Sequence, residues 1–277
     1  MFKYSVKTVL FSLLLLLSPL IKAAGDNYPV GAKASGMGNA AVMFSDVWSL
    51  YHNQAGLAFL NQTTLGFHFE NRFIIEDLSL AATGFVLPTK TGVFGLSLSY
   101  WGFQLYNETK AGLAYSRNFG EKFSAGIQLD YMNVHISEFE NKGAVVIEGG
   151  LQAQPVDKLW VGAHIYNPTQ TKISEYHQEK LPTIMRLGTS YMFGSKVLLS
   201  VETEISSHAN PVYKSGLEYQ FIDNLFLRLG ISTNPTLNTF GLGYVFKNIM
   251  ADFAFSNHPE LGIIPHFSLN YRFGKEK

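Results

Sequence analysis

The chain has 277 residues, no cysteine, and 21 basic against 21 acidic side chains. The absence of cysteine excludes disulfides, a lipidated cysteine and thiolate metal sites, and the neutral charge gives no electrostatic reason to expect nucleic acid. Charged residues make up only 15% of the chain and aromatic residues 14%, so many apolar side chains need an apolar environment.

The first 24 residues are typical of a secretory signal peptide. Lys3 and Lys7 give a positive start, residues 9–20 form an apolar run, and residues 23–24 are alanines suited to cleavage. The run is too short for a spanning helix, and no later segment has 18 consecutive apolar residues. We therefore expect an exported protein whose residues 1–24 are removed.

Residues 25–62 form a compact segment rich in glycine and alanine, without a strand pattern. Ser45 or Asp46 is placed to cap a short helix that would run through Trp48 and Tyr51. Small residues allow the backbone of such a segment to lie close to another surface.

From Thr63 onward, apolar and polar residues alternate with a period of two. Leu217, Tyr219 and Phe221 form one row, and Glu218 and Gln220 belong to the other. Such alternation predicts strands with one apolar and one polar face. Fourteen strands are predicted at 63–70, 77–87, 92–103, 107–119, 122–135, 143–154, 158–166, 182–193, 196–206, 212–221, 224–233, 236–246, 249–256 and 262–273.

Most of these strands are near ten residues long, which is sufficient for a tilted strand to cross a bilayer, and their number is even, as in bacterial barrels. Every second connection is short, such as 194–195 and 247–248, whereas those between are mostly longer, such as 135–142 and 167–181. Short periplasmic turns opposite longer loops are typical of outer-membrane barrels. We therefore expect an antiparallel transmembrane β-barrel with both termini periplasmic; a soluble β-sandwich is the alternative.

The glycines of the predicted strands lie almost entirely on the polar, lumen-facing rows. Only Gly84 and Gly149 are assigned to the lipid-facing rows. A strand glycine often marks the close approach of another backbone. The eleven lumen-facing glycines are Gly66, Gly95, Gly112, Gly126, Gly150, Gly162, Gly188, Gly216, Gly230, Gly241 and Gly243.

We interpret this distribution as a plug formed by residues 25–62 inside the barrel, where irregular backbone is tolerated at membrane depth. The alternative is that the glycines only accommodate strand coiling and curvature. The domain prediction is thus a signal peptide at 1–24, a plug at 25–62 and a barrel at 63–277.

The segment "GAKASGMGNAAV", followed by Asp46 and "SLYHNQAGLAFL", resembles the N-terminal signature of the PorV/PorQ outer-membrane family, which is distantly similar to the FadL-type transporters. The matching positions include Gly36, Met37, Gly38, Asp46, Asn53 and Gly56. Gln54 departs from the pattern, since the family usually has proline there. The resemblance implies a fourteen-stranded barrel with an N-terminal segment inside. It also implies either a role beside type IX protein-export machines or passage of hydrophobic small molecules.

Several ionisable residues are predicted to face the lumen, and none forms a local catalytic signature. They include His68, His164, His266, Asp130, Glu148, Glu202, Glu204, Glu218, Asp252, Arg186, Arg228 and Arg272. We interpret them as an ion-pair network that fills a plugged lumen, and we expect no enzymatic activity, no cofactor and no metal site.

The leading functional hypothesis is an accessory or scaffold subunit of a larger outer-membrane complex for protein export or barrel assembly. The alternative hypothesis is a FadL-like channel for hydrophobic small molecules. Such a channel would need an apolar pocket between plug and wall. The candidate lining residues are Phe44, Trp48, Leu50, Tyr51, Phe85 and Trp101.

Overall fold

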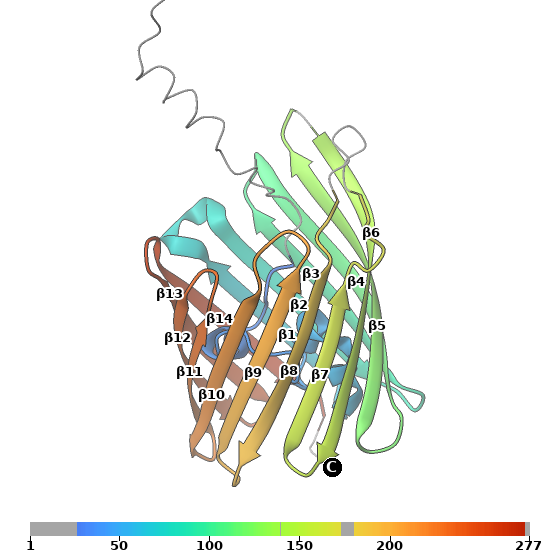
Figure 1. Ribbon diagram of the computed structural model, residues 1–277, viewed down its shortest axis with the longest axis vertical. Coiled ribbons are helices and arrows are strands. Elements are labelled where there is room, and N and C mark those ends of the chain that lie inside the picture. The colour runs from blue at the N-terminus through green and yellow to red at the C-terminus, as the bar shows by residue number, and fades with distance from the viewer. Residues whose placement is uncertain (1–26, 139, 173–179, 275–277) are drawn as a thin grey trace, which may run out of the picture.

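The computed structural model describes residues 27–138, 140–172 and 180–274. They form one closed barrel of fourteen antiparallel strands, in which each strand pairs with its neighbours in sequence and β1 pairs with β14 (Figure 1). The prediction of a fourteen-stranded antiparallel barrel is confirmed. The predicted signal peptide lies outside the described residues.

The strand bounds follow the predicted ones closely. They are β1 Thr64–Asn71, β2 Ser79–Pro88, β3 Val93–Gly102, β4 Tyr106–Asn118, β5 Phe123–Ile136, β6 Glu140–Val156, β7 Leu159–Tyr166, β8 Ile184–Phe193, β9 Val197–Ser206, β10 Val212–Ile222, β11 Leu225–Ser232, β12 Leu237–Phe246, β13 Ile249–His258 and β14 Gly262–Arg272.

The two ends of the barrel differ in their connections. At one end, here the turn end, short turns such as 157–158 and 247–248 join the strands, and the last described residue, Gly274, lies there (lower end in Figure 1). The opposite loop end carries residues 167–172 and 180–183 and the two short helices η2 (Arg72–Ile74) and η3 (Glu76–Leu78).

The loop end has less loop and more strand than the sequence indicates. We expected residues 135–142 to form a loop, but β5 continues to Ile136 and β6 begins at Glu140. Because the two strands remain paired up to Ile136 and Glu140, they extend beyond their neighbours as a hairpin (Figure 1).

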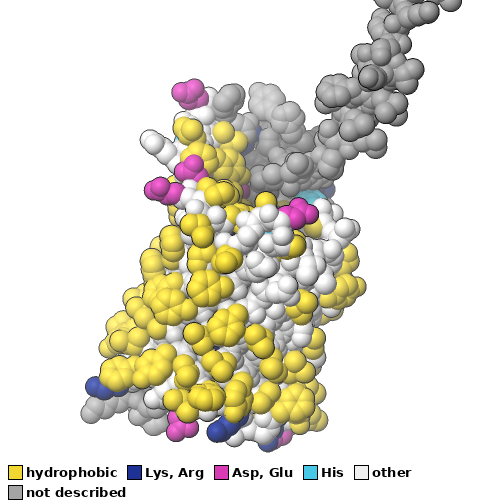
Figure 2. Space-filling view, turned by 90° about the vertical axis from the view of Figure 1, so that its left-hand side faces the viewer, with side chains coloured by type: hydrophobic (Ala, Val, Ile, Leu, Met, Phe, Trp, Pro, Cys, Tyr) yellow, Lys and Arg dark blue, Asp and Glu magenta, His cyan; other side chains and the backbone are white. Residues whose placement is uncertain are grey.

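Large apolar side chains cover the outer surface of the barrel. Along β12, for example, Phe240, Leu242 and Tyr244 are 42%, 39% and 49% exposed, whereas the alternate residues Gly241 and Gly243 are buried. Figure 2 shows hydrophobic side chains over most of the wall and charged ones near the two ends. Among the described residues, no helix has the length and apolar character needed to span a bilayer, a finding that does not address crossing by strands.

The segment from Asn27 to Gln62 lies inside the barrel and fills its middle. It contains three short helices, α2 (Ala32–Gly36), α3 (Ser49–His52) and η1 (Gln54–Phe59). α2 lies against β11 to β14, and η1 lies against β3 to β6. We call this segment the plug.

The plug explains the lumen-facing glycines. All eleven predicted ones face inward, and all except Gly112 and Gly243 have plug atoms where a Cβ would stand. Gly241, for instance, packs its backbone directly on that of Gly36. The interpretation that something packs closely against the inner wall is therefore confirmed.

The assignment of Gly84 to the lipid-facing row is wrong. A Cβ at Gly84 would meet the plug residues Leu50 and Val47 at 2.9 and 3.0 Å. The inner row of β2 is apolar because it packs on the plug, and it includes Leu80, Ala82 and Val86. Choosing the more polar row of this strand as the inner one therefore inverted its faces.

Candidate functional site

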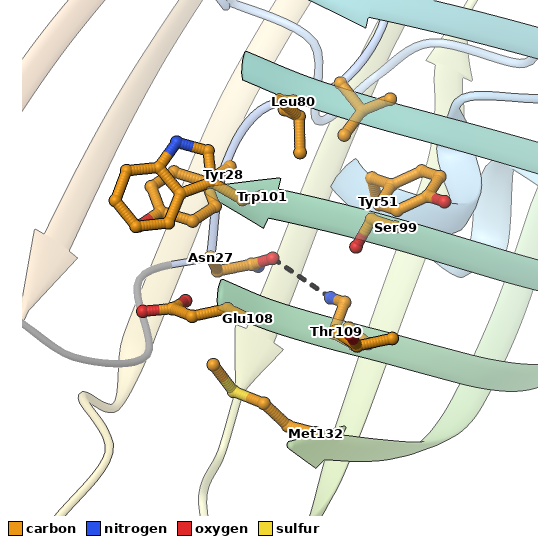
Figure 3. Close-up of a pocket in the computed structure, with 11 residues that line it drawn as sticks. Asn27, Tyr28, Tyr51, Leu80, Ser99, Trp101, Glu108, Thr109 and Met132 are labelled. Carbon is orange, nitrogen blue, oxygen red and sulfur yellow. Dashed lines mark hydrogen bonds between the residues drawn. The ribbon is translucent and has the colours of Figure 1, made fainter. Parts of the chain in front are cut away.

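A narrow pocket lies between the plug and the wall near the loop end (Figure 3). Its volume is about 20 Å³, which leaves room for roughly one water molecule. Strands β2 to β5 supply one side of it and the start of the plug supplies the other. The lining residues are Asn27, Tyr28, Val30, Tyr51, Leu80, Ser99, Trp101, Glu108, Thr109, Lys110 and Met132. We call this space the luminal pocket.

Two stacked aromatic rings lie at one side of the luminal pocket. Tyr28 of the plug stacks on Trp101 of β3, with ring centroids 5.3 Å apart and an interplanar angle of 29°. The guanidinium of Arg72, from η2, lies 4.5 Å from the Tyr28 ring centroid. Aromatic stacking and cation–π contacts of this kind hold the beginning of the plug to the loop end.

Lys110 supplies the positive charge of the luminal pocket. Its Nζ donates hydrogen bonds to Asn27 Oδ1 at 3.2 Å (dashed line in Figure 3) and to Glu148 Oε1 at 3.1 Å. Asp130 Oδ2 lies 4.0 Å away, and the rings of Tyr51 and Tyr166 face the ammonium at about 5.5 Å. Lys110, whose side chain is only 11% exposed, is thus paired, as a charge in a low-dielectric interior must be.

An apolar cluster continues from the luminal pocket toward the loop end. Met132 belongs to both the pocket and this cluster, which is otherwise formed by β5 to β8 and Leu181. Its members are Met132, Val134, Ala144, Val146, Tyr166, Leu181 and Ile184, with Tyr106 and Ile136 packed against them. We call it the upper apolar cluster; its side chains are buried against one another on the inner wall, above Lys110.

Most of the predicted luminal ionisable side chains form ion pairs. Two clusters of such pairs lie on β8 to β13. Arg186 pairs with Glu204 at 2.8 Å, and Lys214 bridges Glu204 and Glu202 at 2.7 and 2.8 Å. Farther along the wall, Arg228 binds Glu218 and Asp252, both at 2.6 Å. The predicted set of luminal ions did not include Lys110 and Lys214, although each alternates with a predicted lumen-facing glycine, Gly112 or Gly216. Arg272 differs from the rest because it is exposed at the turn end.

The network also holds the plug. Glu202 Oε2 accepts hydrogen bonds from the backbone N–H groups of Ala41 and Val42, both at 2.8 Å. Glu148 Oε2 accepts one from Gln54 Nε2 at 2.8 Å and contacts His164 Nε2 at 3.0 Å. Glu202 therefore satisfies two backbone donors of the plug, and Glu148 gives the Gln54 amide a wall partner in addition to Leu50 O, which it reaches at 3.3 Å within the plug.

The residues of the N-terminal signature occupy special positions in the plug. Gly38 has φ +64°, a left-handed conformation that favours glycine, and its N–H donates to Thr239 Oγ1 at 3.0 Å. Asp46 Oδ1 accepts from Trp48 N–H at 2.9 Å and closes a turn before α3. The N-cap residue of α3 is Trp48, without a side-chain capping bond, so neither Ser45 nor Asp46 caps the helix as predicted. Met37 is fully buried, and Gly56 has no room for a side chain beside Phe44 O. Gly36 lies tight against Gly241, whose Cα would be 3.0 Å from an added Cβ, so a small side chain needs only a slight shift there.

Asn53 connects the plug to the wall. Its Nδ2 donates to Val42 O at 2.7 Å and to Leu151 O of β6 at 3.0 Å, and its Oδ1 accepts from Ala55 N–H at 3.1 Å. His52, one residue earlier, is fully buried, and burial lowers the pKa of its imidazole to about 3. The neutral ring contacts Val30 O through Nε2 at 2.7 Å.

The six candidate pocket residues do not form one pocket. Trp48, Leu50 and Tyr51 belong to one buried cluster with Trp101 packed against it, and Tyr51 and Trp101 line the luminal pocket. Phe44 lies in a separate cluster with Met37 and Ala41. Phe85 is on the outer row of β2, because the alternate residues of that strand face the plug.

A groove of about 330 Å³ crosses the outer surface of β3 to β6. Its walls are apolar, and the two small residues Ala111 and Gly112 form its floor. On the inner side of that floor lie Ser97 and Asp130, whose side chains would meet a Cβ at Gly112. The groove is therefore the place where the outer surface comes close to the lumen near Lys110.

No protein-family model and no curated protein sequence match the chain. Solved structures with similar folds include the toluene transporter TbuX of Ralstonia pickettii, with a TM-score of 0.67, 14% identity, and coverage of 88% of this chain and 98% of that one. The toluene transporter TodX of P. putida gives 0.64 and 13%, covering 91% and 100%. A Pseudomonas aeruginosa FadL homologue gives 0.62 and 13%, also covering 91% and 100%. At such identities, the likeness establishes a shared FadL-like barrel fold.

Proposed function

We propose that this chain is a non-enzymatic channel of the bacterial outer membrane that passes hydrophobic small molecules, with the plug as its gate. The observation that carries the proposal is a FadL-like barrel closed by an internal segment, together with an apolar inner wall that leads to the luminal pocket. Two of the proteins with similar folds are described as toluene transporters. In this proposal the turn end, with the C-terminus, faces the periplasm.

The route begins at the upper apolar cluster. Met132 and Tyr166 belong to this buried cluster, which adjoins Tyr51 and Trp101 of the luminal pocket, so a solute enters where the packing of the cluster opens. An apolar solute would gain free energy by leaving water for these apolar side chains. Lys110 and its carboxylate partners lie just beyond, so a charged barrier follows the apolar binding surface.

Passage requires movement of the plug or of the wall. A space of about 20 Å³ is too small for an aromatic ring, since an engineered cavity that binds benzene has about 150 Å³. The outer groove over Gly112 offers one exit toward lipid, and displacement of the plug offers the other, toward the turn end. We assign the gate to the plug because its start forms one side of the luminal pocket.

A disulfide between plug and wall tests this gate. A Cβ at Gly36 would lie 3.5 Å from Ala254 Cβ, within the usual range for a disulfide. The chain has no cysteine of its own, so Gly36→Cys with Ala254→Cys forms a defined pair. In vesicles whose outer leaflet is lipopolysaccharide, which slows the unassisted crossing of apolar compounds, we expect the oxidised pair to reduce toluene uptake at least roughly tenfold and a reductant to restore it, because the disulfide holds α2 of the plug on β13.

The two single variants, Gly36→Cys and Ala254→Cys, are the matched controls, because they share the side chains but cannot lock the plug. Equal uptake by the oxidised and reduced pair would contradict the plug as gate. If the native chain gave no uptake above protein-free vesicles with the same lipopolysaccharide leaflet, for toluene and for longer apolar compounds, the channel function itself would be refuted.

A second candidate function is the accessory subunit of a larger outer-membrane complex for protein export or barrel assembly. The observation in its favour is the close packing at the luminal pocket, where plug and wall leave about 20 Å³; a wider space of about 330 Å³ remains between them at the turn end. Purification from native membranes in mild detergent separates the two functions. A stoichiometric large partner would support the accessory subunit, and a lone barrel with bound lipid or apolar compounds would support the channel.

A further inference from the structure

Three ionisable side chains meet on the inner wall where the barrel closes. His68 and Glu70 alternate along β1 and therefore share its inner face, and His266 of β14 is the backbone partner of Glu70. All three are buried, with 0%, 2% and 7% of their surfaces exposed. One ligand atom from each lies within 4.8 Å of those of the other two.

Each of these side chains has two polar atoms. One of them is bound to a neighbouring group, and the other points toward the remaining two side chains. His68 Nδ1 contacts Ser268 Oγ at 2.9 Å, and His266 Nε2 contacts Ser256 Oγ at 3.0 Å. Arg72 Nε donates to Glu70 Oε1 at 2.6 Å. The remaining atoms are His68 Nε2, His266 Nδ1 and Glu70 Oε2. This is the usual arrangement around metal ligands, whose second polar atoms are fixed by neighbouring groups.

The remaining atoms are disposed as ligands of one cation would be. His68 Nε2 is buried and has no hydrogen-bond partner among the described residues. His266 Nδ1 lies 3.2 Å from Glu70 Oε2, close to the roughly 3.3 Å between two ligands at about 2.0 Å from a tetrahedral zinc ion. The ligand atom of His68 lies within 4.8 Å of the other two, so the ring must move closer to complete the site.

We propose that His68, Glu70 and His266 form a binding site for a divalent transition-metal cation of the zinc class. Two imidazoles and a carboxylate are a donor set that suits zinc, with a fourth position left for water. The cation would join the first and last strands of the barrel. It would also steady the plug, because Ser268 Oγ accepts a hydrogen bond from Ala32 N–H at 2.8 Å as well as contacting His68.

Metal titration of the folded full barrel in detergent, after removal of metal by a chelator, tests the site. We expect one zinc ion per chain by elemental analysis and calorimetry, and magnesium should not compete because it prefers oxygen ligands. Because the Arg72 guanidinium is a nearby competing cation, we expect micromolar affinity. His68→Gln and Glu70→Gln should each abolish the stoichiometric zinc.

His208→Gln is the matched control, since His208 lies exposed in the loop before β10 and should leave binding unchanged. Ser256→Ala keeps all three ligands but removes the partner of His266, so zinc affinity should fall roughly 10- to 100-fold. Zinc binding that is unchanged in His68→Gln, or absent from the native barrel, would overturn the proposal.

Failure of the ligand variants to fold would show as loss of the heat-dependent gel shift of barrels. In that case the visible absorption spectrum of cobalt bound to the native protein tests the site. Intense visible bands of four-coordinate cobalt with nitrogen ligands are expected, and a weak octahedral spectrum would overturn the site.

The Ser256–His266–Glu70 contacts also resemble a hydrolase relay. Labelling of Ser256 by a fluorophosphonate, without zinc binding, would likewise overturn the metal site.

Discussion

Asn53 shows how a single side chain fixes the plug in the lumen. Its amide joins a plug carbonyl, a wall carbonyl and the first turn of η1, and the side chain is fully buried. Removal of the amide would leave the carbonyl oxygens of Val42 and Leu151 buried without this donor. An unsatisfied buried polar group costs about 1–3 kcal/mol.

We therefore expect Asn53→Ala to lower the free energy of unfolding by about 3 kcal/mol. Urea unfolding in detergent, followed by tryptophan fluorescence, measures this change because Trp48 is buried in the plug. Asn248→Ala is the control: its Nδ2 donates one exposed hydrogen bond to Gly274 O, and its effect should stay within about 0.5 kcal/mol. Equal effects of the two substitutions would contradict the anchoring role of Asn53.

Gln54 explains why a departure from a family pattern need not disturb the local fold. The resembled family usually has proline at this position, yet the turn forms, with Asn53 capping η1. The Gln54 amide donates to Glu148 Oε2, a bond that proline cannot make. The sequence showed the departure, but its compensation depends on Glu148, which is 94 residues away along the chain.

At the scale of elements, strand positions were predictable and strand faces less so. The period-two pattern located all fourteen strands because one face of each strand is turned to a polar lumen and the other carries the apolar side chains of the outer surface. That contrast fails on β2, where Leu80 and Val86 pack on the apolar part of the plug. It also fails at the β5–β6 hairpin, because backbone pairing continues beyond the region where burial produces alternation.

Two adjacent glycines of β6 provide a matched test of the plug contact. A Cβ at Gly150 would collide with the Asn53 side chain, whereas one at Gly149 would have Gly126 O as its nearest neighbour, at 3.9 Å. Valine favours strands, so Gly149→Val should fold normally. Gly150→Val should push Asn53 and η1 off the wall.

We expect Gly150→Val barrels to conduct ions in planar bilayers, because a displaced η1 leaves a water-filled path along β6. The native barrel and Gly149→Val should remain closed. Folding of both variants is checked by their resistance to unfolding on unheated gels. If Gly150→Val were as closed as Gly149→Val, the contact between η1 and β6 would not be what seals the lumen.

At the scale of the whole molecule, the pairing of β1 with β14 closes the barrel and determines which residues of the two strands meet. Local sequence patterns do not predict this pairing. His68 and Ser268 are 200 residues apart, yet they are cross-strand partners because β1 pairs with β14. The inward direction of His68 and His266 was predictable from alternation. Their proximity was not, because it depends on the register across the closing pair of strands.

The outer surface leads to the last prediction, which concerns the medium in which the barrel folds. Leu242 lies in the middle of β12 on the outer row and is 39% exposed. If this row faces lipid, Leu242→Arg should cost about 2–4 kcal/mol when the barrel folds into vesicles, because a charge near the bilayer midplane loses its hydration.

Asn224→Arg adds the same charge at the exposed turn between β10 and β11, where the cost should be about 0–1 kcal/mol. Urea titrations of both variants in phosphatidylcholine vesicles give the difference. Equal costs, or a native chain that stays monomeric in buffer without detergent, would mean that the exposed Leu and Phe rows do not face lipid. The channel and the accessory subunit would then both lose their basis, because each requires the barrel to span the membrane.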